Sequence, residues 1–195
     1  MSKVEIISKE TVFEDFFKIE SAIVKYQRFD GHMSKPVRRL NFVRGDSVAA
    51  VIYDERRDLV ILVNQFKYPT YSHGSGWITE LAAGMVSDSE DPESSIRREI
   101  LEETGYQVKS LEHLTTFYVS PGGTSERIWL YLALVDSDSK ISDGGGVPSE
   151  EEDINIIEMS LSDAWQAVKD GGIADAKTIL GLMWLSTSRG QSWKP

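Results

Sequence analysis

The chain has 195 residues, a length that predicts one domain of average size with a small appendage, and its 41% hydrophobic and 27% charged residues are enough for a sizeable core. It contains no cysteine, which excludes disulfides and predicts a reducing, cytoplasmic location. The formal net charge of −10 argues against nonspecific binding to nucleic acid, and no apolar run approaches the ~18 residues that cross a membrane.

The N-terminal part of the chain predicts a small antiparallel sheet. Apolar and polar residues alternate over 16–29 and again over 37–44, as in strands that bury one face, and Asp30–Gly31 predicts a turn between them. Two nearly continuous apolar runs follow at 47–53 and 58–66. Such runs predict central strands that are buried on both faces.

The segment 84–106, GMVSDSEDPESSIRREILEETGY, predicts a helix. Asp91 followed by Pro92 predicts its start, because aspartate caps free backbone N–H groups and proline fits the first helical position. Gly105 predicts its end, since a residue in the left-handed conformation often closes a helix.

Three carboxylates gather on one side of this predicted helix. Glu99, Glu102 and Glu103 fall within an arc of roughly 100° at the helical spacing. Like charges at these separations repel, and a bound Mg²⁺ or Mn²⁺ would remove the repulsion because hard cations take carboxylate oxygens. Arg98 would pair with one carboxylate and hold it in place. A solvated acidic face is the alternative for any such charge run.

The remaining sequence predicts strands that alternate with helices. The predicted elements are strands at 108–120 and 127–135, a long flexible loop at 136–153, a strand at 154–160, a helix at 160–172 that ends at Gly171, and a final helix at 175–188. This order, with one extra sheet in front, predicts an α/β fold.

The spacing G-x5-E-x7-R-E-I-x-E-E-x-G, from Gly84 to Gly105, resembles the Nudix box of hydrolases that cleave a nucleoside diphosphate linked to another group. The resemblance implies an α/β/α sandwich with a mixed sheet, preceded by a small N-terminal antiparallel sheet. It implies a dimerisation subdomain at 1–45 and a catalytic domain at 46–195. Tyr106 departs from the pattern, which usually ends on an aliphatic residue.

The resemblance also implies a metal site for Mg²⁺, with Mn²⁺ as the alternative ion. Glu90 would support the ligands without binding the metal itself. The implied ligands are the carboxylates of Glu99, Glu102 and Glu103 and the backbone carbonyl of Ala83.

A second motif lies just after the box. Pro121, in the stretch SPGGTSER, stands sixteen residues beyond Gly105 and resembles the turn of the ADP-ribose pyrophosphatases within the Nudix family. The resemblance places Arg44 and Glu80 near the substrate. Lys67 stands where the family usually has an arginine that touches the phosphates, and lysine lacks its bidentate fork.

The general base is expected in the acidic loop before the strand at 154–160. Glu150 matches the base of the family pattern E-x-E-D-I best, and Glu152 is the second candidate, whereas we expect Glu151 to be solvated. The glycines of GGGV, just before this run, would supply a hinge for loop closure. Tyr26 and Phe29 are candidates for stacking on the adenine, although packing is the more common role of such residues.

These features together predict a Mg²⁺-dependent enzyme that hydrolyses ADP-ribose to AMP and ribose 5-phosphate. The resemblance implies a homodimer in which each active site borrows residues from its partner. The alternative substrate is GDP-mannose or another nucleotide sugar, because GGGV and the DAKT segment at Asp175 resemble the GDP-mannose-cleaving relatives. A non-catalytic nucleotide-sensing domain is a third hypothesis, which the complete set of box glutamates disfavours.

Overall fold

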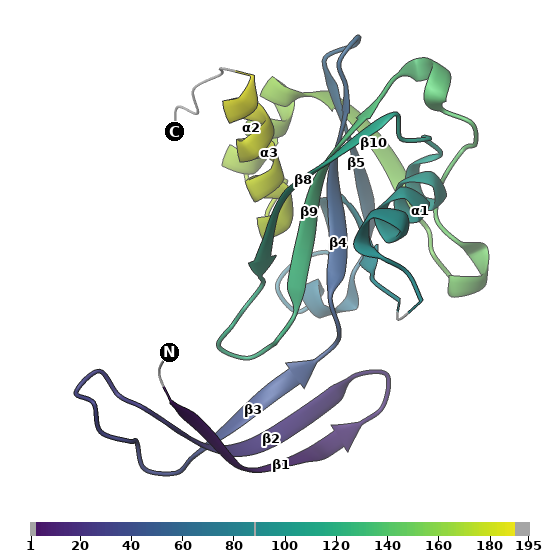
Figure 1. Ribbon diagram of the computed structural model, residues 1–195. Helices are drawn as coiled ribbons and strands as arrows, with labels where there is room; N and C mark the ends of the chain where they lie inside the picture. Colours follow the sequence, from purple (N-terminus) through teal and green to yellow (C-terminus); the bar gives the residue numbers. More distant parts are fainter. Residues whose placement is uncertain (1–2, 88, 190–195) are drawn as a thin grey trace. The chain divides into compact units, whose positions relative to one another are not determined.

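The residues that the structure describes form two β-sheets (Figure 1). The computed structural model describes residues 3–87 and 89–189. Within it the chain divides into two units, each of which packs mainly with itself. The first unit contains residues 1–46 and 118–127, and the second contains residues 47–117 and 128–195.

The first unit is built on a three-stranded antiparallel sheet in the order β1-β2-β3. Its strands are β1 (Val4–Glu14), β2 (Lys18–Tyr26) and β3 (Val37–Val43). The segment 118–127 joins this sheet, because the N–H of Phe42 donates to the carbonyl of Gly123 at 2.9 Å. The predicted subdomain at 1–45 did not include this segment, whose pairing partner lies about eighty residues earlier in the chain.

The second unit holds a seven-stranded sheet in the order β10-β5-β4-β9-β8, with β6 paired to β5 and β7 paired to β4. β4 and β9 run parallel, and β4 is antiparallel to both β5 and β7, so the sheet is mixed. The strands are β4 (Ser47–Asp54), β5 (Leu59–Phe66), β6 (Trp77–Glu80), β7 (Ala82–Met85), β8 (Ser110–Tyr118), β9 (Arg127–Val135) and β10 (Asn155–Ser160).

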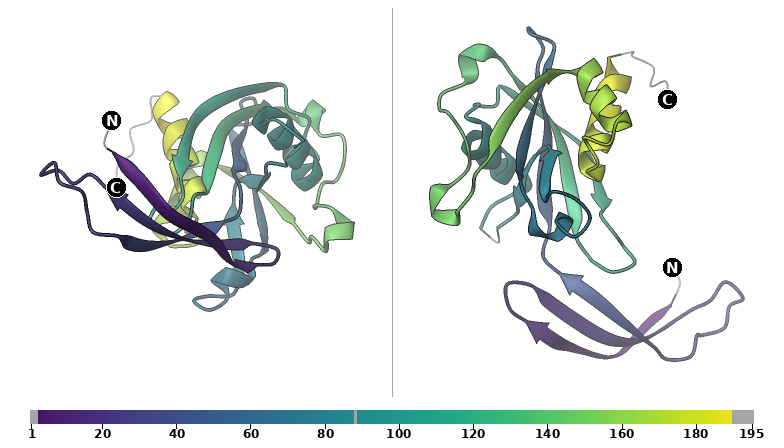
Figure 2. Two further views of the ribbon diagram at one scale, coloured as in Figure 1. Left: turned by 60° about the horizontal axis from the view of Figure 1, so that its bottom comes forward. Right: turned by 180° about the vertical axis from the view of Figure 1, so that it is seen from behind.

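Three helices cover the two faces of this sheet (Figures 1 and 2). α1 (Pro92–Thr104) packs on one face, and α2 (Leu161–Lys169) and α3 (Ala176–Ser188) pack together on the other. Every residue of β4 is buried, as expected of a central strand covered on both sides. The predicted α/β/α sandwich with an additional N-terminal antiparallel sheet is therefore confirmed. No helix among the described residues has the length and apolar character needed to cross a membrane.

The limits of α1 follow from its capping residues. Asp91 accepts hydrogen bonds from the N–H groups of Glu93 and Ser94, both at 3.0 Å. Gly105 closes the helix with φ of 76°, and its N–H donates to the carbonyl of Leu101. Both predicted helix ends are confirmed, because each depends on local chain chemistry.

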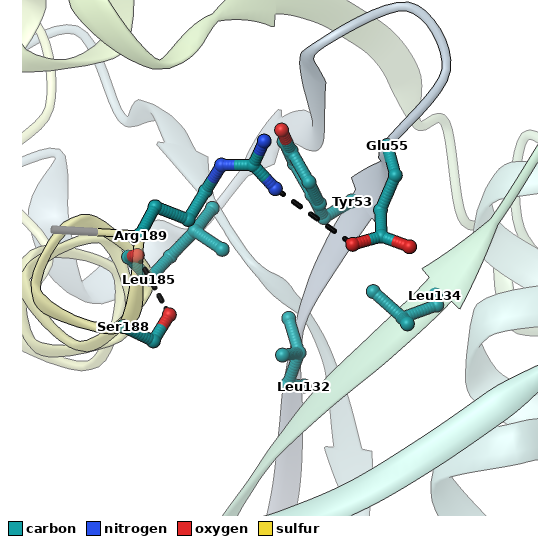
Figure 3. A pocket seen from close by; sticks show the side chains of 7 residues that line it. All are labelled: Tyr53, Glu55, Leu132, Leu134, Leu185, Ser188 and Arg189. Carbon is teal, nitrogen blue, oxygen red and sulfur yellow. Dashed lines mark hydrogen bonds and ion pairs between the residues drawn. The ribbon is translucent and has the colours of Figure 1, made fainter.

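A cavity of about 350 Å³ lies between the sheet and the C-terminal end of α3, on the face opposite α1 (Figure 3). Its polar groups already contact one another, since the Arg189 guanidinium lies 4.6 Å from the ring centroid of Tyr53 and 3.7 Å from Glu55. The rest of its wall is formed by the leucine residues at 132, 134 and 185 and by Ser188. None of these residues belongs to the predicted site.

On the α1 side, Arg57 links three elements of the second unit. Its guanidinium donates to Asp54 at 2.6 Å and to Glu158 at 2.6 Å, and also to the hydroxyl of Tyr106 at 2.9 Å. Asp54 is fully buried and Tyr106 is 1% exposed. Tyr106, the residue that departs from the usual box pattern, therefore uses its hydroxyl to fix the end of the box to β10.

We expect the substitution Arg57→Met to lower the free energy of unfolding at pH 7 by about 2–3 kcal/mol, because it leaves Asp54 buried without its cationic partner. Urea denaturation measures this loss. Arg97→Met is the control: it removes an exposed ion pair with Glu93 and a long hydrogen bond of 3.4 Å to the carbonyl of Val108, and it should cost about 0.5 kcal/mol. Equal losses in the two variants would contradict a stabilising role for Arg57.

The loss of unfolding free energy caused by Arg57→Met should depend on pH. Hydrogen bonding to Arg57 lowers the pKa of Glu158. Burial raises the pKa of Asp54, but the hydrogen bonds from the Arg57 side chain and backbone outweigh burial and leave this pKa lowered as well. Carboxyls with lowered folded-state pKa values stabilise the fold above their unfolded pKa of about 4, and this stability is lost as the pH falls through the folded pKa. The gap between wild type and Arg57→Met should therefore shrink in acid.

Candidate active site

Two carboxylates of α1 lie directly against the backbone of β7. Glu103 accepts a hydrogen bond from the N–H of Ala83 at 3.2 Å. A Cβ atom placed on Gly84 would overlap the Glu99 carboxylate and lie 2.7 Å from its Cγ. Only glycine at position 84 therefore lets Glu99 approach the strand, which gives a physical reason for the glycine that begins the box.

Burial makes both carboxylates unusually basic. It raises the pKa of Glu103, which is only 2% exposed, well above the ordinary range, and the charges of Glu99 and Glu80 add to this rise. Burial also raises the pKa of Glu99, against the opposing effect of Arg98. The buried Glu103 and the partly buried Glu99 form an acidic centre that nearby positive charge would stabilise.

Arg98 gathers the remaining carboxylates of the box. It donates to Glu102 at 2.8 Å and lies 3.0 Å from Glu99. It also donates to Glu90 at 3.2 Å, and this hydrogen bond is the main cause of the lowered pKa of Glu90. Ser95 donates to the same carboxylate at 2.9 Å. The predicted pairing of Arg98 with the acidic cluster is present, and Glu90 supports it from the loop before the helix.

The chemistry of this cluster fits a divalent cation. Its donors are carboxylate oxygens beside the partly buried backbone of β7, and oxygen atoms are the hard ligands that Mg²⁺ prefers. Within the described ranges, no three His, Cys, Asp or Glu side chains are already arranged around one ion position. Arg98 accounts for this arrangement, because it draws Glu102 and Glu99 to its own guanidinium. The predicted ligand set of Ala83, Glu99, Glu102 and Glu103 stays a prediction.

A second charged group lies beside the acidic centre. Glu80, at the end of β6, is 6% exposed and forms an ion pair of 3.7 Å with Lys67. The field of Glu80 raises the pKa of Glu103 and that of Lys67 lowers it, so both predicted residues act on the box carboxylates. Lys177 also pairs with Glu80. The sequence prediction used the DAKT segment as a resemblance but did not single out this lysine.

The three acids of the loop before β10 have different environments. Glu150 ends a short 3-10 helix (Pro148–Glu150) and is exposed, and the exposed Glu151 adopts a left-handed backbone with φ of 55°. Glu152 accepts a hydrogen bond from the N–H of Val147 at 2.9 Å. Its charge is also one of the causes of the raised pKa of Glu99. In this conformation Glu152 is therefore the loop acid held toward the box.

The glycines before this loop attach it to the end of α1. Gly144, Gly145 and Gly146 all have positive φ, at 68°, 100° and 89°. The N–H of Gly145 donates to the carbonyl of Glu103 at 2.9 Å, and that of Gly146 to the carbonyl of Glu102 at 3.0 Å. In this conformation the glycines hold the loop on α1, because the N–H groups of Gly145 and Gly146 reach free carbonyls of the last helical turn. Their predicted role as a hinge stays a prediction.

Four of the residues singled out in the sequence belong to the first unit. Arg44 lies 3.5 Å from Glu126, with its guanidinium 5.5 Å from the ring centroid of Phe17. Pro121 is exposed in a turn closed by the N–H of Gly123 and the carbonyl of Ser120 at 3.0 Å. The aromatic candidates are both exposed, Tyr26 at 40% and Phe29 completely. Box carboxylates, Lys67, Glu80 and the acidic loop are together in the second unit.

Comparison with known proteins tests the family assignment. The family model for the NUDIX domain matches residues 43–180. The chain belongs to the Nudix family. The predicted family, and with it the class of Nudix hydrolases, is confirmed, and a family match of this kind generally implies a divalent metal.

Curated relatives match almost the whole length of this Nudix protein. It is 38% identical to the GDP-mannose pyrophosphatase of Cronobacter sakazakii, over 93% of this chain and 94% of that one. It is 37% identical to the ADP-ribose pyrophosphatase of Haemophilus influenzae, over 98% and 91% of the two chains. A solved structure described as an ADP compounds hydrolase covers 97% of each chain with a TM-score of 0.73 at 19% identity, which supports the fold.

We expect the substitution Gly84→Ala to weaken binding of Mn²⁺ by roughly 10–100-fold, because the added methyl group displaces Glu99 from the strand. Titration calorimetry with Mn²⁺ alone measures the affinity. Gly74→Ala is the matched control, since its added Cβ would lie 3.9 Å from the nearest carbonyl oxygen and should leave binding unchanged. Equal Mn²⁺ affinity in the two variants would show that Glu99 is not part of the metal site.

Proposed function

We propose that this protein hydrolyses the pyrophosphate bond of ADP-ribose to AMP and ribose 5-phosphate, with Mg²⁺ as its metal. The observation that carries the proposal is the placement of two α1 carboxylates against the backbone of β7: Glu103, which is 2% exposed, accepts a hydrogen bond from the N–H of Ala83, and Glu99 lies against Gly84. The stretch SPGGTSER and the relatives named ADP-ribose pyrophosphatase support the choice of substrate. GDP-mannose is the second candidate, supported by relatives of equal similarity and by the DAKT segment.

In this proposal Glu99, Glu102, Glu103 and the carbonyl of Ala83 hold the metal. When bound, a divalent ion supplies positive charge that polarises the diphosphate and acidifies the attacking water. Arg98 fixes the orientation of the carboxylates.

The other predicted residues act on the substrate and the water. Glu150 accepts a proton as the water oxygen bonds to phosphorus and the bridging P–O bond breaks. Lys67 pairs with a phosphate oxygen. Glu80 acts on the substrate through the lysines that it pairs with, and the family resemblance places Arg44 and Pro121 near the remainder of the substrate.

We also propose a homodimer built through the N-terminal sheet. Every residue of the edge strand β1 is exposed, including Val4, Ile6 and Phe13. A long exposed edge strand with apolar side chains favours pairing with another chain, and a second copy would cover it. The cytoplasmic location predicted from the cysteine-free composition stays a prediction.

A coupled phosphatase assay across ADP-ribose, GDP-mannose, NADH and diadenosine polyphosphates tests the substrate. We expect the highest kcat/KM for ADP-ribose, with AMP and ribose 5-phosphate as products. A higher kcat/KM for GDP-mannose would transfer the assignment to the second candidate. Tight binding of ADP-ribose without any product would instead indicate a nucleotide-sensing domain.

Substitutions in the same assay test the residue roles. Glu103→Gln should lower kcat at least about 100-fold with Mg²⁺. Glu150→Gln should lower it by about 10²–10⁴, the usual contribution of a general base. Glu151→Gln is the matched control and should retain the wild-type rate, since Glu151 points into solvent. A near-wild-type rate in Glu150→Gln, with a large loss in Glu152→Gln, would move the base to Glu152.

A further inference from the structure

Lys177 is an almost buried cation at the start of α3. Its side chain is 12% exposed, and its Nζ contacts the carboxylate of Glu80 and lies 3.1 Å from Asp175. Burial lowers the pKa of Lys177, but the charges of Glu80 and Asp175 outweigh burial and leave the pKa raised. The ammonium group is therefore charged, and the two carboxylates stabilise this charge in place of water.

The start of α3 is itself fixed to the strand that carries Glu80. Asp175 caps the helix and accepts hydrogen bonds from Thr178, from the backbone N–H at 2.9 Å and from the hydroxyl at 2.6 Å. The Thr178 hydroxyl oxygen in turn accepts a hydrogen bond from the N–H of Leu81, also at 2.9 Å. Because Leu81 follows Glu80, these bonds hold Lys177 and Glu80 in a defined relative position.

Glu80 is shared unequally between two lysines. One carboxylate oxygen, Oε2, contacts Lys177. The other, Oε1, is buried, has no hydrogen-bond partner among the described residues, and lies 3.7 Å from the Nζ of Lys67. That separation is an ion pair without a hydrogen bond. The Lys67 side chain is 43% exposed, so its ammonium group can still reach a ligand in solvent.

We propose that Lys177 is a positioning residue that neutralises Glu80 and so leaves the Lys67 ammonium available for a phosphate oxygen of the substrate. Without Lys177, the nearest cation to the buried Glu80 carboxylate is Lys67. The two would then close into a direct hydrogen-bonded pair, because a buried carboxylate is costly unless a donor satisfies it. Phosphate would have to compete with Glu80 for Lys67. This role rests on the proposed function of the site.

The proposal predicts a specific pattern of kinetic constants. Lys177→Met should raise KM for ADP-ribose about 10-fold while kcat stays within about threefold, since the affected contact binds substrate rather than assisting bond cleavage. Lys177→Arg keeps the charge and should recover most of the affinity. In Glu80→Gln there is no carboxylate to capture Lys67, so adding Lys177→Met to it should change KM little.

A double-mutant cycle over Lys177→Met and Glu80→Gln separates this role from a direct contact with substrate. If Lys177→Met raises KM by the same factor in the wild type and in Glu80→Gln, Lys177 acts on the substrate itself and the proposal is overturned. Thermal unfolding of each variant checks folding. The double variant is the one expected to fold best without Lys177, because it leaves no uncompensated buried carboxylate.

Calorimetric titration with inorganic pyrophosphate gives a readout that needs no turnover. We expect about 10-fold weaker binding to Lys177→Met and recovery in the double variant. If wild type cleaves no nucleotide sugar but this binding pattern appears, the proposed reaction fails and the role of Lys177 stands. Equal pyrophosphate affinity in wild type and Lys177→Met would overturn that role even in an active enzyme.

Discussion

Contact between the carboxylates of α1 and the backbone of β7 is the constraint on which the rest of the site depends. Apolar packing fixes the helix, since Ile96 and Ile100 are fully buried in the core formed with β4 and β5. The same packing brings Glu99 and Glu103 against Ala83 and Gly84, where burial opposes their ionisation. The core therefore offsets the cost of an acidic centre that adds no stability of its own, a combination typical of functional sites.

The positive charges that compensate this centre come from three different elements. Arg98 lies on α1 and pairs with the acids of its own helix. Lys67 follows β5, and Lys177 begins α3, and both meet at Glu80. Cations from three parts of the chain can therefore stabilise the box carboxylates and Glu80 at the same time, while Lys67 stays without a direct hydrogen bond to a carboxylate of the described residues. Lys67 is the cation with the longest contact, 3.7 Å to Glu80, and its side chain is 43% exposed, so it is the one best placed to reach a ligand.

Features of the fold that depend on neighbouring residues could be predicted from the sequence. Features that depend on contacts between distant parts of the chain could not. Asp91 and Gly105 define α1 through caps that depend only on neighbouring residues. By contrast, segment 118–127 packs with the N-terminal sheet through a bond to Phe42, and no local pattern signals that partner. Lys177 was overlooked for the same reason: its spacing in DAKT suits any exposed helix start, and only the tertiary structure buries it.

The glycines at 144–146 show how a local pattern predicts a backbone conformation but not the long-range contact in which that conformation is used. Glycine predicts access to positive φ, and all three residues adopt it. Here that conformation serves hydrogen bonding to the carbonyls of Glu102 and Glu103. The acidic loop and the box carboxylates thus share one support, the last turn of α1. Because Gly145 and Gly146 are bonded to α1, any displacement of Glu150 relative to the box would have to occur beyond Gly146, where Glu152 accepts a hydrogen bond from the N–H of Val147.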